Sequence, residues 1–214
     1  MQPETLNYLL WQKERGLTQT KARPIEKSNE LIYEDSLKES SESCRKCSLA
    51  INRSQPIWGI GTDQCQVAFV GDVYDYDKES NDPGTLPTTQ LSLLKKMIAA
   101  IKLSQSDAYI CNLVLCPGTT GELTPQHLLA CREYLLAQLT KSNPKFIVSM
   151  GEIATKNLTS YTKDFKQTVG QWLSFSLDES IRVMPIYHPR DLIREPQLKI
   201  PTWQGLQKLM PAIS

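Results

Sequence analysis

The stretch that decides the fold runs from Asp107 to Cys131 and reads DAYICNLVLCPGTTGELTPQHLLAC. Its first part, from Tyr109 to Leu115, is an apolar and partly β-branched run, which predicts a strand. Pro117 and Gly118 come next, and these residues do not continue a central strand. The strand is therefore predicted to give way to a loop at this point.

A helix is predicted to begin directly after that loop. Thr124 supplies an N-cap and Pro125 a pre-set first helical turn. Asn112 is an unusual residue for the predicted strand. Asparagine is disfavoured in strands, yet Asn112 lies inside the apolar run. Two explanations stay open: a neighbouring turn satisfies the amide, or the amide lies near the strand's carboxyl end and points into a ligand crevice.

The same order of strand and helix continues on both sides of this stretch. Further strands are predicted at residues 66–70, 146–148, 172–177 and 181–186, and further helices at 91–101, 153–158 and 202–209. This alternation predicts an α/β fold with a mostly parallel sheet and helices on both faces. Four strand ends then meet at one edge of the sheet, and they carry Asp72, Asn112, Gly151 and His188.

Composition narrows the class of protein. With 214 residues, one compact domain plus a tail is expected. The formal net charge of +1 is too small for the protein as a whole to attract nucleic acid, so DNA binding would need a local basic patch. No stretch is apolar enough to cross a membrane, and residues 1–4 do not begin a signal peptide. We therefore expect a cytoplasmic protein without a membrane partner.

Residues 1–43 differ in composition from the rest of the chain. Residues 6–11 give a short predicted helix an apolar side, and residues 17–43 are rich in Ser, Lys and Glu, which predicts a flexible linker. The folded domain is expected to span residues 44–214. The apolar side of the first helix either packs on this domain or docks to a protein partner. Residues 16–24 faintly resemble the docking tail of the psi subunit of the bacterial polymerase III clamp loader, so a partner is assigned to residues 1–24.

Six cysteines in a cytosolic chain indicate metal or redox chemistry more than disulfides. Cys44 and Cys47 have the spacing at which two thiols can bind one metal, although a redox pair or two unrelated cysteines would share it. Cys116 and Cys131 lie at the end of the central strand and inside the next helix. Four-cysteine sites hold either zinc or an iron–sulfur cluster, and the spacing alone leaves that choice open.

Taken together, the motifs resemble those of the iron–sulfur (family 4) uracil-DNA glycosylases. The resemblance covers residues 44–209 and is carried, in order, by CRKC (44–47), the Gly71-Asp72 strand end, YICNLVLC (109–116), LLAC (128–131), IVSMG (147–151) and YHPRDLIR (187–194). It implies the uracil-DNA glycosylase fold, a three-layer α/β/α sandwich. It also implies that Cys44, Cys47, Cys116 and Cys131 hold a [4Fe-4S] cluster, whereas Cys65 and Cys111 fall outside the pattern.

The resemblance also implies roles for residues at the sheet edge. Asn112 would read the edge of uracil, because its amide offers one donor and one acceptor in a plane. His188 would stabilise the departing uracil anion, and Asp72 would hold the attacking water. Gly71 and Tyr74 would line the substrate site. DNA would be the partner, contacted by Arg190 and Arg194, with single-stranded DNA preferred over duplex because the base need not be extruded.

Two departures from the family pattern bear on activity. The family's first motif reads Gly-Glu-Ala-Pro-Gly, whereas residues 71–75 read Gly-Asp-Val-Tyr-Asp. The family's base-stacking phenylalanine has no aromatic counterpart in residues 83–89, PGTLPTT. Stacking contributes about 1–3 kcal/mol per base.

Three hypotheses for the function follow. The protein is a glycosylase that excises uracil or a related deaminated base, or a weak or inactive relative that serves as a DNA-binding or replication and repair accessory module. The third hypothesis is a zinc or redox protein unrelated to DNA.

Overall fold

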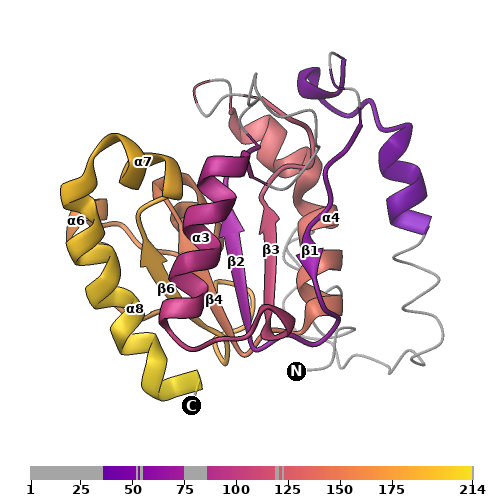
Figure 1. The fold of residues 1–214 in the computed structure, drawn as a ribbon. Helices are drawn as coiled ribbons and strands as arrows, with labels where there is room; N and C mark the ends of the chain where they lie inside the picture. The colour runs from indigo at the N-terminus through magenta and orange to yellow at the C-terminus, as the bar shows by residue number, and fades with distance from the viewer. Residues whose placement is uncertain are drawn as a thin grey trace.

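In the computed structural model, which describes residues 36–51, 53, 55–74, 86–118, 121 and 123–213, a six-stranded sheet forms the centre of the molecule (Figure 1). The strands are β1 (Ile60–Gly61), β2 (Val67–Gly71), β3 (Ala108–Asn112), β4 (Phe146–Met150), β5 (Leu173–Ser174) and β6 (Arg182–Ile186). Their spatial order is β1-β3-β2-β4-β6-β5. The four inner strands pair in parallel and the two edge strands pair antiparallel, which confirms the predicted mostly parallel sheet.

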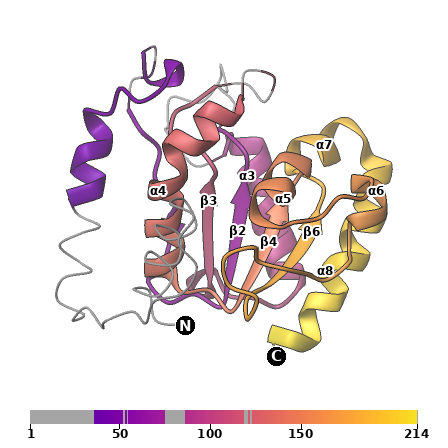
Figure 2. The same ribbon diagram turned by 180° about the vertical axis from the view of Figure 1, so that it is seen from behind.

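Helices cover both faces of this sheet. They are α3 (Thr88–Ala100), α4 (Pro125–Ser142), α5 (Glu152–Leu158), α6 (Phe165–Thr168), α7 (Pro189–Arg194) and α8 (Lys199–Ile213), with short 3-10 turns η1 (Ser48–Ala50), η2 (Gln105–Asp107) and η4 (Pro196–Leu198). Helices α4 and α5 pack on one face, and α3 and α8 pack on the other (Figures 1 and 2). The predicted α/β/α sandwich is confirmed. No helix in the described part of the chain is both long and apolar enough to span a membrane.

The alternation of side chains along β2 shows why the sheet carries two cores. Val67 and Phe69 join the cluster formed with α3 and α8, whereas Ala68 and Val70 join the cluster formed with α4 and α5. Every residue of β2 is buried. A strand that is covered on both faces needs a continuous apolar run, and this is the pattern that the sequence shows.

The start of α4 follows the predicted signals. Thr124 is the N-cap, Pro125 is the first helical residue, and the Thr124 hydroxyl accepts a hydrogen bond from the backbone N–H of His127. The His127 ring in turn accepts from the backbone N–H of Thr124, which completes a capping box. The helix ends at Ser142. Asn143 is its C-cap, and the left-handed backbone of this residue closes the last turn just before Pro144.

The central strand is shorter than predicted. β3 ends at Asn112, whereas the apolar run continues to Leu115. Leu113 and Val114 still donate hydrogen bonds to the backbone oxygens of Gly71 and Asp72, but as parts of a buried loop. Asn112 is therefore the last residue of its strand, which is the position that a ligand-facing amide requires.

The linker predicted for residues 17–43 is wrong at its carboxyl end. Residues 36–42 are helical and rest against the domain (Figure 1). Ser41 is fully buried and accepts a hydrogen bond from Trp58 Nε1 at 3.0 Å, and Leu37 packs beside Tyr134 and its neighbours. These two residues give a polar segment enough contact to fold. The predicted helix at residues 4–16, whose apolar side is formed by residues 6–11, lies outside the described residues.

Candidate active site

The carboxyl ends of the four parallel strands meet at one edge of the sheet. Gly71 at the end of β2 pairs with Asn112 at the end of β3, and Met150 at the end of β4 pairs with Ile186 at the end of β6. Asp72, Gly151 and His188 follow these ends within two residues. The convergence that the topology predicts for this edge is therefore confirmed.

Gly71 lies beneath two side chains that face each other across the edge. A Cβ added to Gly71 would lie 2.5 Å from Asn112 Oδ1 and 3.3 Å from His188 Nε2. A real Cβ essentially never comes as close as the first of these contacts. The missing side chain thus lets the amide of Asn112 and the ring of His188 approach one point from two strands.

His188 presents a single, defined hydrogen-bond donor. It is the N-cap of α7, and its Nδ1 accepts a hydrogen bond from the backbone N–H of Arg190 at 3.3 Å. Because Nδ1 is the acceptor, the proton of the neutral ring resides on Nε2. Nε2 is buried and has no hydrogen-bond partner among the described residues. The site therefore contains an N–H that is ready for a ligand.

The surroundings keep this imidazole neutral. Burial lowers the pKa of His188 to about 3, and the positive charge of Arg190 contributes to the same shift. The carboxylate of Asp72 acts in the opposite direction and is the smallest of the three influences. The ring of His188 is therefore neutral, with its proton on Nε2.

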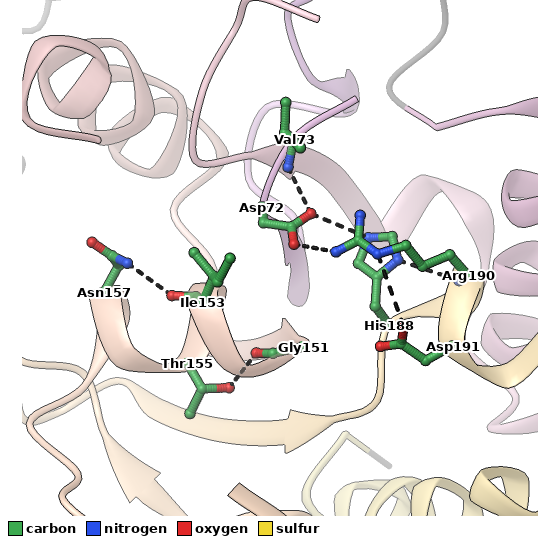
Figure 3. A network of polar contacts seen from close by, with 9 residues as sticks. All are labelled: Asp72, Val73, Gly151, Ile153, Thr155, Asn157, His188, Arg190 and Asp191. Atoms are coloured by element: carbon green, nitrogen blue, oxygen red, sulfur yellow. Dashed lines mark hydrogen bonds and ion pairs between the residues drawn. The ribbon is translucent and has the colours of Figure 1, made fainter. Parts of the chain in front are cut away.

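Asp72 is held inside the protein by two donors (Figure 3). Its Oδ1 accepts a hydrogen bond from the backbone N–H of Val73 at 2.7 Å, and its Oδ2 binds the guanidinium of Arg190. Oδ1 also lies 3.8 Å from His188 Nε2. Asp72 is 1% exposed and Arg190 is 8% exposed, so this is a buried ion pair. Sequence reasoning missed the pair, since no spacing rule links the two positions.

The buried position of Arg190 differs from the role given to it above. Its guanidinium binds Asp72 within the protein, whereas Arg194, at the end of the same helix, is exposed. Contact between either arginine and DNA stays a prediction.

Tyr74 is also buried. Its backbone oxygen accepts a hydrogen bond from the Gly118 N–H at 3.0 Å, which connects the loop after β2 to the loop after β3. Residues 75–85, including the first three residues of the 83–89 segment without an aromatic side chain, lie outside the described residues.

The four cysteines of the motif share one region of the fold, because Cys44, Cys47 and Cys116 all influence Cys131 electrostatically. Cys116 and Cys131 are buried, while Cys44 and Cys47 are partly exposed. Burial raises the pKa of the Cys131 thiol to about 12, and charge on the other three thiols raises it as well. Four thiolates this close would repel one another unless a metal centre balanced their charge.

Arg53 contacts both halves of this cysteine group. Its Nη1 donates to Cys116 Sγ at 3.2 Å, and its Nη2 donates to the backbone oxygens of Ser41 at 2.5 Å and Cys44 at 3.2 Å. One guanidinium therefore fastens the segment with the first cysteine pair to the loop after β3. Sequence reasoning missed Arg53, because an arginine six residues after a cysteine pair carries no specific signal.

The donor set fits a four-iron cluster. No three His, Cys, Asp or Glu side chains in the described ranges are arranged around a single metal ion. Four cysteine thiolates are the ligands that a [4Fe-4S] cluster takes, so Cys44, Cys47, Cys116 and Cys131 would fit such a group. Cys65 and Cys111, which are outside the motif, are buried in the core as ordinary thiols.

Comparison with known proteins adds an independent finding. Residues 58–207 match the family model described as "Uracil DNA glycosylase superfamily". A "Type-4 uracil-DNA glycosylase" of Archaeoglobus fulgidus is 30% identical over 168 residues, covering 73% of this chain and 81% of the relative. A protein of the same name from Thermotoga maritima is 28% identical, with 73% and 81% coverage, and one from Saccharolobus solfataricus is 23% identical, with 84% and 86% coverage.

Proposed function

Because the chain belongs to the uracil DNA glycosylase superfamily, we propose that it is a hydrolase that excises uracil from DNA, as in base excision repair. The observation that carries the proposal is that Asn112 Oδ1 and the Nε2–H of the neutral His188 ring both lie close to Gly71 at the same edge of the sheet. The accessory-module alternative is not favoured, because several relatives are named as glycosylases. Related deaminated bases stay within the proposed substrate class.

Asn112 is proposed to select the base. Its planar amide offers a donor and an acceptor side by side, which matches the O4 and N3–H of uracil. Cytosine presents the reversed pattern and would leave both groups of the amide unsatisfied. In a buried site an unsatisfied polar group costs about 1–3 kcal/mol, so this pairing discriminates strongly.

His188 is proposed to stabilise the departing base. Cleavage of the N-glycosidic bond leaves the electron pair on the base, and negative charge builds up at O2. The Nε2–H can donate to this charge without giving up its proton, since a neutral imidazole is a weak acid. A donor fixed in place before the reaction costs no reorganisation, which is the main advantage of such electrostatic stabilisation.

Asp72 is proposed to act on the sugar. The anomeric carbon gains positive charge as the bond to the base lengthens, and a buried carboxylate can stabilise this charge. We also assign to Asp72 the positioning of the water that attacks the same carbon. Water adds its oxygen to the sugar, and its two protons end on the new hydroxyl and on the released base. Gly71 and Tyr74 are proposed to line the pocket in which this occurs.

Cys44, Cys47, Cys116 and Cys131 are proposed to hold a [4Fe-4S] cluster. The support is their common region, their mutual electrostatic influence and the Arg53 hydrogen bond to Cys116 Sγ. When bound, such a group supplies structural cross-linking and one-electron chemistry. We propose the structural role here, because these cysteines join the segment before β1 to the start of α4.

DNA is the proposed partner, with single strands preferred. Duplex DNA must first extrude the base, at a cost of a few kcal/mol. Residues 83–89 contain no aromatic residue to hold the extruded base, so that cost is harder to recover. Arg190 and Arg194 are kept as proposed DNA contacts, residues 1–24 as a proposed site for a protein partner, and the cytoplasm as the proposed location.

The experiment that tests base selection compares uracil with cytosine. Single-stranded oligonucleotides with one uracil, or with cytosine at the same place, are incubated with wild type and Asn112→Ala, and free base is measured. Wild type should release uracil alone. Asn112→Ala should lose discrimination against cytosine more than it loses rate. Equal discrimination by the two proteins would remove Asn112 from the recognition role.

A further inference from the structure

We propose that Arg190 is a positioning residue: its guanidinium binds the Asp72 carboxylate and so prevents Asp72 from capturing the Nε2–H of His188. The donor then stays available for the departing base. The role in base departure rests on the proposed function. The competition between Arg190 and His188 for Asp72 rests on the geometry of this chain alone.

Arg190 contacts both other members of the group. Its side chain binds Asp72 Oδ2, and its backbone N–H donates to His188 Nδ1 at 3.3 Å (Figure 3). The backbone contact fixes the tautomer, because it makes Nδ1 the acceptor and leaves the proton on Nε2. The side-chain contact fixes the carboxylate that lies beside this proton. One residue thus sets both the direction and the availability of the donor.

The distance between Asp72 and His188 defines the competition. Oδ1 of Asp72 lies 3.8 Å from His188 Nε2, which is longer than a hydrogen bond and short enough to close by a small rotation of the carboxylate. A buried carboxylate without a cation takes the nearest donor, since burying a lone charge is costly. If Arg190 lost its charge, that donor would be His188. The Nε2–H would then donate to Asp72 instead of the base, while Nδ1 keeps its hydrogen bond from the backbone N–H of residue 190.

The charges around His188 support the direction of this effect. From α7 it is approached by Arg190 and Asp191, and from the loop after β2 by Asp72. Asn112 and Gly151, from the ends of β3 and β4, carry no charge. Oδ1 of Asp191 lies 4.0 Å from Nε of the Arg190 guanidinium. Burial is the largest influence on the pKa of His188 and keeps the ring neutral, whereas Arg190 offsets the attraction between the ring and Asp72, so neutralising Arg190 leaves that attraction unopposed.

The test follows the Nε2–H proton of His188 directly. The chain has two histidines, so protein labelled with ¹⁵N-histidine gives the ring signals of His127 and His188 alone. The assignment comes from His127→Gln. Between about pH 5 and 8, the range in which histidine normally titrates, His188 of the wild type should stay neutral with the proton on Nε2. In Arg190→Gln the ring should stay neutral, but the signal of its Nε2–H proton should move downfield, as expected for an N–H that donates to a carboxylate.

Three further variants separate a positioning role of Arg190 from a general loss of structure. Arg190→Lys keeps a cation near Asp72 and should keep the wild-type signal of the Nε2–H proton. Asp72→Asn combined with Arg190→Gln removes the competing carboxylate and should return this signal toward its wild-type position. Arg182→Met removes an exposed arginine at the opposite end of β6 and should change nothing. These variants also keep the test decisive if Arg190→Gln is poorly folded, because a downfield Nε2–H signal in the double variant would contradict the competition.

The proposal is overturned if the Nε2–H signal of His188 in folded Arg190→Gln keeps its wild-type position across this pH range. This measurement involves no substrate, so its outcome does not depend on whether the protein releases uracil. A parallel assay on uracil-containing single strands should show kcat falling by about 10²-fold in Arg190→Gln with KM little changed, as expected for a loss confined to the transition state. An unchanged kcat would also contradict the proposal.

Discussion

At the scale of single residues, the state of His188 makes a prediction about pH. The proposed mechanism uses the neutral ring, and the pKa of His188 is lowered to about 3 by burial first and by Arg190 second. The neutral form is therefore complete well above pH 3 and is lost only as the pH falls toward that value. Uracil release should show no His188-dependent decline between about pH 8 and pH 5. A decline centred near pH 6.5 that disappears in His188→Gln would contradict this.

Removal of the side chain tests its contribution at fixed pH. His188→Ala should slow single-turnover uracil release by about 10²–10³-fold, as for other preorganised donors. DNA affinity, measured by fluorescence anisotropy with a non-cleavable uracil analogue, should change much less. A loss of binding as large as the loss of rate would instead give His188 a role in substrate binding.

Gly71 provides a second test at this scale. Gly71→Ala places a methyl group 2.5 Å from Asn112 Oδ1, so the amide must move away from the base-reading position. We expect a folded protein with its cluster intact and with uracil release reduced at least 10²-fold. Gly121→Ala is the matched control, because a Cβ there meets no atom within 4 Å. Equal loss in the two variants would show that the amide does not depend on Gly71.

At the scale of secondary-structure elements, apolar runs and helix caps allowed most of the layout to be predicted. β2, β4 and β6 follow buried apolar runs, and α4 begins at the predicted Thr124-Pro125 pair. β1 and α6 were missed because they contain two and four residues, too few to show a period. The end of β3 was missed because Leu113 to Leu115 are buried in a loop, and burial alone gives a loop the composition of a strand.

The candidate site was only partly predictable for a similar reason. The positions of Asp72, Asn112 and His188 follow from topology, because parallel strands end at one edge. The Asp72–Arg190 pair depends on how α7 turns back over the sheet, and 118 positions separate the two residues. Arg53 likewise reaches Cys116 across 63 positions. Local patterns carry no information about side chains that meet over such separations.

The cysteine-bearing elements lead to a prediction about the cluster. The purified protein should be brown, with about four irons per chain when the site is filled. Cys131→Ala should bleach it. Arg53→Met should assemble the cluster and lose it faster under oxygen, because the hydrogen bond to Cys116 Sγ and the tie to the Ser41 segment are both removed. Visible absorbance followed over time measures this. A colourless protein with stoichiometric zinc would contradict the cluster proposal.

At the scale of the whole molecule, the division between tail and domain can be tested by truncation. Residues 36–42 are helical, with Ser41 buried against Trp58, so the domain begins before residue 44. Removal of residues 1–35 should leave the brown colour and the melting temperature unchanged. Removal of residues 1–43 should weaken the brown colour and lower the melting temperature, because Arg53 and Trp58 then lose their hydrogen-bond partners in this helix. Equal behaviour of the two truncations would place the boundary at residue 44 after all.

The measurement that tests the central claim most directly is the release of free uracil from a single-stranded oligonucleotide that contains one uracil. Wild-type protein with a full complement of iron is used at stoichiometric concentration, so that even slow excision is detected, and the same strand in a duplex is tested in parallel. We predict release from both, faster from the single strand, and strongly reduced release with His188→Ala. No free uracil from either substrate with the fully loaded wild type would contradict the claim that this sheet edge is a uracil-excising active site.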